Sequence, residues 1–110
     1  MSEFIRIGKK RDFPTNRATG IVVEGKNVCV ANHEGRLYAF DDRCTHAESL
    51  LSAGDLEECE IVCPLHGARF SIETGAALTL PAVRPVRTHD IKVEGEDVSL
   101  RLKEPLPDEA

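Results

Sequence analysis

The fold of this chain is decided by two short segments, Cys44-Thr45-His46 and Cys63-Pro64-Leu65-His66, which are separated by sixteen residues. Each segment offers one thiolate and one imidazole. Sulfur and imidazole ligands together suit zinc or an iron–sulfur cluster. Zinc fingers usually carry two cysteines on one arm and two histidines on the other, whereas both arms are mixed here. A [2Fe–2S] cluster with two thiolates on one iron and two imidazoles on the other could take one ligand of each kind from each arm.

This spacing, with Pro64 inside the second arm and Gly67 after it, resembles the Rieske iron–sulfur signature. A four-ligand motif of fixed spacing is a strong signal. The resemblance runs from about Phe4 to Leu102, and it is closest to the small ferredoxins that supply electrons to bacterial ring-hydroxylating dioxygenases. It implies one [2Fe–2S] cluster per chain. The implied ligands, which are also the only metal-binding residues expected, are Cys44, His46, Cys63 and His66.

The resemblance also implies a function. The chain would be a monomeric one-electron carrier in aromatic hydrocarbon catabolism. It would take electrons from a flavin-dependent reductase and pass them to a terminal oxygenase, with no catalytic residues of its own. Three alternatives stay open: an oxygenase in its own right, a Rieske-like small subunit of an assimilatory nitrite reductase, and a zinc-stapled interaction module. The first is disfavoured because, beyond the two arms, only His33 and His89 are left to hold a second metal.

Composition excludes several other classes of partner. The chain has 110 residues, a net charge of −5 and a pI of about 5.3. An acidic chain is a poor match for nucleic acid or an anionic membrane surface. It contains no apolar run of eighteen residues and no signal-peptide pattern at its start, so we expect a cytoplasmic protein. In that compartment cysteines bind metals more often than they form disulfides, and Cys29 and Cys59 are interpreted as small hydrophobic side chains.

The hydrophobic pattern predicts an all-β protein. Strands are expected at residues 4–7, 21–23, 27–32, 36–40, 60–62, 67–72, 87–93 and 98–102. A loop is expected from Pro14 to Gly20, a short helix from Ala47 to Ala53, and an acidic link from Asp55 to Glu60. Residues 78–85 contain two prolines and cannot form a helix.

These elements predict a single domain over residues 1–110, with the Rieske iron–sulfur fold. An antiparallel sandwich or barrel base, about residues 1–42 and 76–103, would carry an inserted cluster-binding lobe at about 43–75. Residues 104–110 would form a frayed tail. The resemblance also implies that Leu80-Pro81-Ala82 covers one side of the cluster, and the acidic link is a candidate docking surface.

The resemblance also predicts the redox range. High-potential Rieske proteins carry an extra cysteine on each arm, joined in a disulfide, and place a serine and a tyrosine hydroxyl near the cluster. The matching positions here are Ser49 and Leu65 for the cysteines, and Ala68 and Phe70 for the hydroxyls. Alanine and phenylalanine cannot donate hydrogen bonds from their side chains. We therefore expect a potential near the bottom of the Rieske range.

Overall fold

The computed structural model describes residues 3–44, 49–65, 67–80, 82 and 84–103. Almost all of its regular structure is antiparallel β-sheet, as the sequence predicts. Two turns of 3-10 helix interrupt the strands, η1 (Lys10–Asp12) and η2 (Leu51–Ala53). The strands in chain order are β1 (Ile5–Lys9), β2 (Arg17–Val23), β3 (Lys26–His33), β4 (Arg36–Asp41), β5 (Asp55–Glu57), β6 (Glu60–Val62), β7 (Arg69–Ser71), β8 (Thr88–Glu94) and β9 (Asp97–Arg101).

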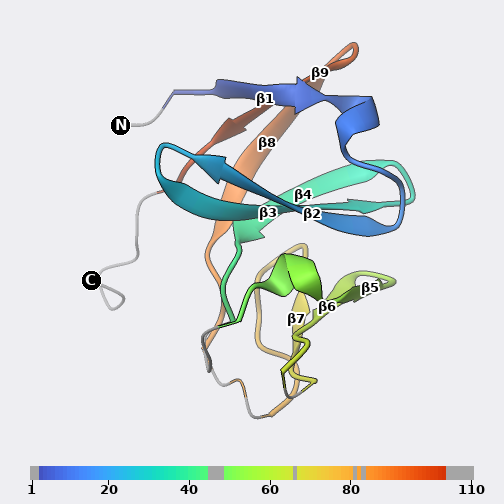
Figure 1. Cartoon of the computed structure of the whole chain (residues 1–110), viewed down its shortest axis with the longest axis vertical. Helices are drawn as coiled ribbons and strands as arrows, with labels where there is room; N and C mark the ends of the chain where they lie inside the picture. Colours follow the sequence, from blue (N-terminus) through green and yellow to red (C-terminus); the bar gives the residue numbers. More distant parts are fainter. Residues whose placement is uncertain (1–2, 45–48, 66, 81, 83, 104–110) are drawn as a thin grey trace.

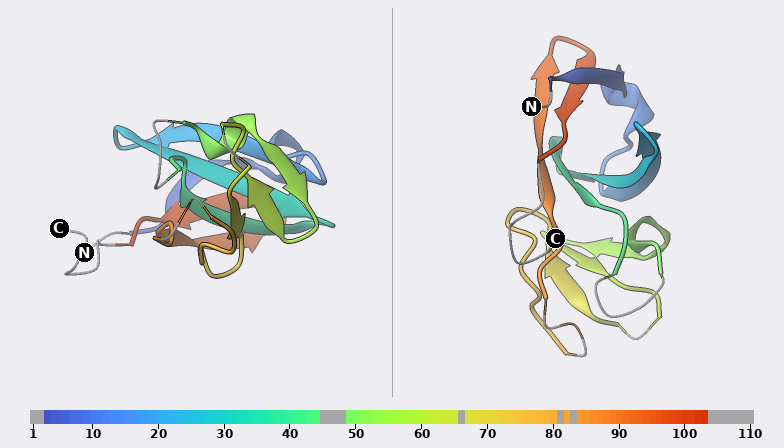
Figure 2. Two further views of the ribbon diagram at one scale, coloured as in Figure 1. Left: turned by 90° about the horizontal axis from the view of Figure 1, so that it is seen from below. Right: turned by 90° about the vertical axis from the view of Figure 1, so that its left-hand side faces the viewer.

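The strands form two sheets of different size. The larger is a six-stranded sheet in the order β1-β9-β8-β4-β3-β2, so strands from the two ends of the chain share it. Figure 2 shows that this sheet curls round on itself. The smaller is a three-stranded sheet in the order β5-β6-β7, which lies at the end of the molecule opposite β1 (Figure 1).

Two tight turns fix the register of the β2–β3–β4 meander. Val23 pairs with Lys26 and His33 pairs with Arg36, so each connection has two residues. Both connections read Glu-Gly, and both residues of each have positive φ: 51° and 80° at Glu24-Gly25, 51° and 93° at Glu34-Gly35. This is the type I′ geometry that suits the twist of a hairpin. The sequence therefore sets these two hairpins through local turn chemistry.

Strand β3 is buried on both faces, which explains its continuous apolar run. Val28 and Val30 pack with residues of the six-stranded sheet, including Leu100 and Val98. The alternate residues, Cys29 and Ala31, belong instead to a cluster that contains Leu51, Ile61, Phe70 and Ile72. Successive side chains on a strand point to opposite faces. One face of the meander therefore packs against the other strands inside the curled six-stranded sheet. The opposite face is covered by the three-stranded sheet and its loops.

Two sequence-based predictions of local structure were wrong, and one strand was missed. Strand β2 begins at Arg17, so the predicted loop from Pro14 to Gly20 is shorter than expected. The described part of the expected 47–53 helix is a 3-10 turn over Leu51–Ala53, while residues 47 and 48 lie outside the described residues. The acidic link contains strand β5, which pairs with β6 across a turn at Glu58 and Cys59. Strands β2 and β5 each pair with the strand that follows them across a two-residue turn. Polar and small residues in them, such as Arg17, Ala18 and Asp55, weaken the alternating pattern that predicts a strand.

Candidate metal centre

Cys44 and Cys63 are both buried in the core beneath the two arms. Each side chain is 1% exposed, and both belong to the same cluster of packed residues. They come from different elements, because Cys44 follows the end of β4 and Cys63 follows the end of β6. The fold thus brings two thiols from distant parts of the chain to one region. None of the four cysteines forms a disulfide bond, and a cysteine outside a disulfide can serve as a thiolate ligand.

The two arms are closed at their bases in the same way. The Cys44 amide donates a hydrogen bond to the carbonyl of Ser49 at 2.9 Å, and the Cys63 amide donates to the carbonyl of Ala68 at 2.7 Å. Each bond therefore links a cysteine to the residue five positions later. In the second arm Gly67 also donates to the Cys63 carbonyl at 3.0 Å and adopts φ 75°, a conformation that favours glycine. The backbone fixes the position of each cysteine from both sides of its loop.

His46 and His66, the two predicted imidazole ligands, lie outside the described residues. Within the described part of the chain, no three histidine, cysteine, aspartate or glutamate residues gather closely enough to hold a metal ion. Among the described residues, the donors beneath the arms are the two buried thiols. Iron–sulfur clusters need thiolates that are shielded from solvent and held by backbone loops, and this pair fits that requirement.

The 78–85 stretch contributes to the same region. Ala82 is 3% exposed and packs in the cluster that contains Cys44 and Cys63, whereas Leu80 is 78% exposed. Pro81, the middle residue of the predicted cover, lies outside the described residues. Leu65, inside the second arm, and Leu50, just after the first, are also about half exposed. Exposed leucines therefore border both arms.

A buried carboxylate secures the base of the first arm. Asp42, two residues before Cys44, is 2% exposed. It accepts hydrogen bonds from the amide of Ser52 at 2.7 Å and from the Ser52 hydroxyl at 2.6 Å. Two bonds of this kind offset the cost of burying a charge. The chain that enters the first arm is thus tied to η2, which follows that arm.

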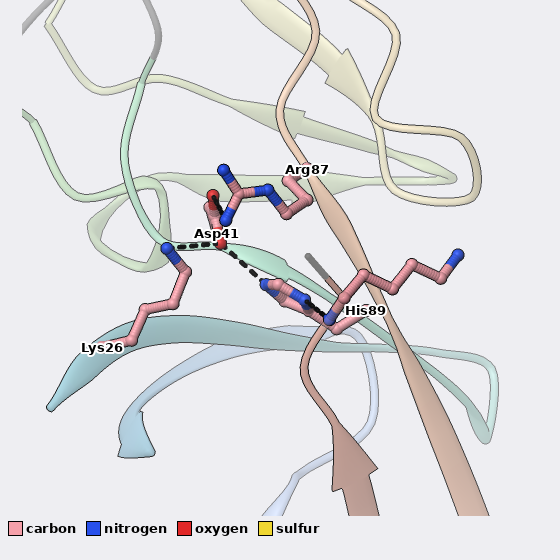
Figure 3. Close-up of polar contacts among 5 residues, drawn as sticks. Lys26, Asp41, Arg87 and His89 are labelled. Atoms are coloured by element: carbon pink, nitrogen blue, oxygen red, sulfur yellow. Dashed lines mark hydrogen bonds and ion pairs between the residues drawn. The ribbon is translucent and has the colours of Figure 1, made fainter. Parts of the chain in front are cut away.

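Asp41 connects the same arm to the larger sheet (Figure 3). Its Oδ1 lies 2.7 Å from His89 Nε2 and 3.5 Å from Lys26 Nζ, and its Oδ2 lies 3.7 Å from Arg87 Nη1. The Lys103 amide donates to His89 Nδ1 at 3.0 Å, so the proton of the neutral ring must be on Nε2, where it is donated to Asp41. Although burial pushes the pKa of Asp41 up, the His89 hydrogen bond and the charges of Lys26 and Arg87 hold it below its usual value.

Sequence reasoning did not identify this network. His89, one of the two histidines outside the arms, is buried and hydrogen-bonded to Asp41. The run Asp41-Asp42, which only Arg43 separates from Cys44, was the available signal, because carboxylates at the entrance of a loop need partners when they are buried. His33 ends strand β3 and lines a shallow pocket together with Asn16 and Glu58.

The other two cysteines fit the predicted hydrophobic role. Cys29 is fully buried on β3, and burial, reinforced by the charge of Asp42, raises the pKa of its thiol well above the ordinary value. Cys59 is partly buried and packs against the same cluster as Cys44. Its pKa is also raised, by desolvation and then by neighbouring acids of which Glu73 is the foremost. Thiols that resist ionisation are poor nucleophiles and poor ligands.

Comparison with known proteins assigns the family. A model of the Rieske [2Fe–2S] domain matches residues 3–90, which include both arms. The chain belongs to the Rieske [2Fe–2S] domain family. The Rieske assignment agrees with the all-β fold and with the two buried thiols on paired loops. It also gives the cofactor of the family, a [2Fe–2S] cluster.

The Rieske relatives of this chain are carrier proteins. The ferredoxin component of the naphthalene 1,2-dioxygenase system of Pseudomonas aeruginosa is 41% identical over 91 residues, covering 83% of this chain and 88% of the relative. The structure of the ferredoxin of carbazole 1,9a-dioxygenase from Nocardioides aromaticivorans is 34% identical, with a TM-score of 0.87, and covers 91% of this chain and 98% of that one. These relatives are electron-transfer components of multicomponent dioxygenases and not their catalytic subunits.

Two further likenesses bear on partners and alternatives. The structure of a complex of reduced oxygenase and oxidised ferredoxin in carbazole 1,9a-dioxygenase matches with 25% identity, a TM-score of 0.86, and coverage of 94% of this chain and 96% of that one. A nitrite reductase small subunit from Mycobacterium tuberculosis is 14% identical with a TM-score of 0.83, over 96% of this chain and 99% of that one. The second likeness shows the fold alone. In the described part of the chain, no helix is long and apolar enough to span a membrane.

Proposed function

We propose that this chain is a monomeric ferredoxin that carries one electron at a time from a flavin-dependent reductase to a terminal ring-hydroxylating oxygenase. The observation that carries the proposal is the 41% identity, over most of both chains, to the ferredoxin component of a naphthalene dioxygenase system. A Rieske ferredoxin in complex with its oxygenase, at 25% identity, supports an oxygenase as the electron acceptor. None of the four cysteines forms a disulfide bond, which supports a reducing, cytoplasmic compartment.

In this proposal one [2Fe–2S] cluster is held by Cys44, His46, Cys63 and His66. When bound, the cluster supplies reversible one-electron chemistry. The chain's own residues hold it in place and shield it. The backbone bonds at the base of each arm fix Cys44 and Cys63, and the buried neighbours Ala68 and Ala82 keep water from the thiolates. Low dielectric around the site strengthens every nearby hydrogen bond.

The docking face in this proposal surrounds the two arms. Leu50, Leu65 and Leu80 are 48%, 52% and 78% exposed, and their segments lie next to the predicted ligands in sequence. Exposed apolar side chains of this kind are a usual component of transient protein interfaces. Contact through the arm ends would place the partner close to the cluster, which favours electron transfer between the two proteins.

The acidic link is a smaller part of this surface than its composition predicts. Arg69 on β7 pairs with Glu57 at 2.8 Å and with Glu60 at 3.3 Å. These two carboxylates are therefore partly neutralised within the chain. Glu58 projects from the β5–β6 turn, with φ 55°. Any electrostatic steering by this link would depend mainly on Glu58 and Asp55, which are both exposed.

The proposal is tested by electron delivery. The purified, reduced protein should transfer one electron per chain to the terminal oxygenase of a naphthalene 1,2-dioxygenase system. Stopped-flow absorption measures this transfer as the return of the visible spectrum of the oxidised carrier. Its reduction potential should be on the order of −150 mV, the lower end of the Rieske range. Ala68→Ser should raise that potential by adding a donor near Cys63. A colourless zinc protein, or a clearly positive potential in the unmodified protein, would overturn the proposal.

A further inference from the structure

A short strap, defined here as residues 50–54, links the end of the first arm to the start of the three-stranded sheet. Leu51 is fully buried in the group of packed core side chains that contains both predicted cysteine ligands. The strap folds as a 3-10 turn in which the Gly54 amide donates to the Leu51 carbonyl at 2.9 Å. Its middle residue, Ser52, makes the two hydrogen bonds to Asp42 described above. The strap is therefore fixed to the entrance of the first arm.

The far end of the strap presses against the base of the second arm. A Cβ atom at Gly54 would lie 1.8 Å from the carbonyl oxygen of Val62, 3.0 Å from its carbonyl carbon, and 3.2 Å from Cδ of Pro64. Val62 and Pro64 flank Cys63 on either side. The backbone at Gly54 therefore touches the residues that hold the second predicted thiolate ligand.

Glycine is required at position 54 by this contact and not by backbone conformation. Gly54 has φ −92° and ψ −175°, an extended conformation that any residue adopts. The obstacle to a side chain is the Val62 carbonyl, a backbone atom in a paired strand that cannot turn away as a side chain can. Any larger residue must push the strap and the second arm apart.

We propose that Gly54 is a positioning residue for the cluster: its contact with Val62 sets the separation of the two arms, in a chain whose cysteines form no disulfide between them. The strap ties Asp42, before Cys44, to Val62, before Cys63. One compact unit thus fixes the entrances of both arms. This inference rests on the proposed assignment of the arms as cluster ligands.

The test compares Gly54→Ala with Gly35→Ala in the cluster-loaded protein. Gly35 has φ 93°, and a Cβ there would meet no atom within 4 Å, so its substitution costs stability through backbone strain alone in a turn of the larger sheet. The readouts are iron and sulfide per chain, the reduced-state electron paramagnetic resonance spectrum, and the rate of iron release to a chelator. Gly54→Ala should release iron several-fold faster and shift the resonance spectrum, whereas Gly35→Ala should leave both unchanged.

Ser52→Ala covers the case in which Gly54→Ala does not fold. It removes the hydroxyl bond to Asp42 at the other end of the strap without adding any atom, and it should speed iron release in the same direction. The proposal is overturned if folded Gly54→Ala keeps the wild-type spectrum and release rate. It is equally overturned if Gly54→Ala fails to fold while Ser52→Ala releases iron at the wild-type rate. A wild-type protein without a cluster signal would instead contradict the proposed function.

Discussion

The six-stranded and three-stranded sheets of this protein are stabilised in different ways. The larger sheet has strands of five to eight residues, tight Glu-Gly turns, and regular pairing over most of its length. The smaller sheet has three strands of three residues each. It depends on individual contacts: the Asp42–Ser52 bonds, the Gly54–Val62 contact and the closed arms. Regular pairing supplies a stable support, and single contacts supply the exact positions that a metal site needs.

Removing a predicted ligand should affect the smaller sheet most of all. Cys63→Ala should abolish iron and sulfide binding, because an iron–sulfur cluster loses most of its stability when one of its thiolate ligands is removed. The three-stranded sheet should then lose protection from proteolysis. Cys59→Ser, at the β5–β6 turn, is the matched control and should keep a full complement of iron. Iron and sulfide analysis of both purified variants checks the prediction, which fails if Cys63→Ala retains a stable cluster.

Two core truncations separate the sheets directly. Leu100 is fully buried within the larger sheet, and Ile61 is fully buried beneath the arms. Truncation to alanine should lower the free energy of unfolding by about 2–5 kcal/mol in either case. Only Ile61→Ala should also speed iron release, because Ile61, unlike Leu100, belongs to the group of packed core side chains that contains Cys44 and Cys63. Chemical denaturation and chelator kinetics measure the two effects. Equal rates of iron release from both variants would show that the core of the larger sheet supports the metal site as much as the core of the smaller sheet does.

Acid should weaken the end of the larger sheet from which the first arm leaves, through Asp41. The pKa of this carboxyl is lowered in the folded protein despite burial, by the His89 hydrogen bond and the nearby cations. A carboxylate with a lowered folded-state pKa stabilises the protein above its unfolded pKa, about 3.9. That contribution is lost as the pH falls through the folded-state value. Asp41→Asn should therefore be less stable at neutral pH, and its stability should fall less below about pH 4.

Denaturation curves between neutral and acidic pH test this expectation. Asp97→Asn is a suitable control, because Asp97 pairs with Arg6 at an exposed site of the larger sheet, where an ion pair contributes little. The Asp41 account is wrong if the two variants show the same dependence of stability on pH.

Surface charge should have the smallest effect. Glu58→Lys should slow electron transfer to an oxygenase at low salt, and the difference should shrink as the ionic strength rises, because exposed charges are screened over about 10 Å at 0.1 M salt. Asp97→Lys, on the larger sheet, should leave the rate unchanged. If Glu58→Lys has no effect at any salt concentration, the acidic link serves only to solvate the smaller sheet.

The same contrast explains how much the sequence could predict. The larger sheet follows from local signals, such as the Glu-Gly turns and the apolar residues of β3, so its strands were largely predicted. The Rieske motif identified the arms from four residues, of which Cys44 and Cys63 lie together in the core, while His46 and His66 stay predictions. The Gly54 contact and the Asp41 network could not be predicted, because each depends on a partner that only the fold brings near. Strand β5 was missed because two of its three residues are acidic, and acidic residues are uncommon in strands.

The most direct test of the account is pulsed electron paramagnetic resonance of the reduced protein, which detects nitrogen nuclei bound to the cluster. Two thiolates and two imidazoles on one [2Fe–2S] cluster predict coupling to two directly bound nitrogens. His66→Cys should remove one of these couplings, while His89→Gln should remove none. A spectrum without bound nitrogen, or a protein that contains zinc and gives no signal, would contradict the assignment of the two arms as a Rieske centre.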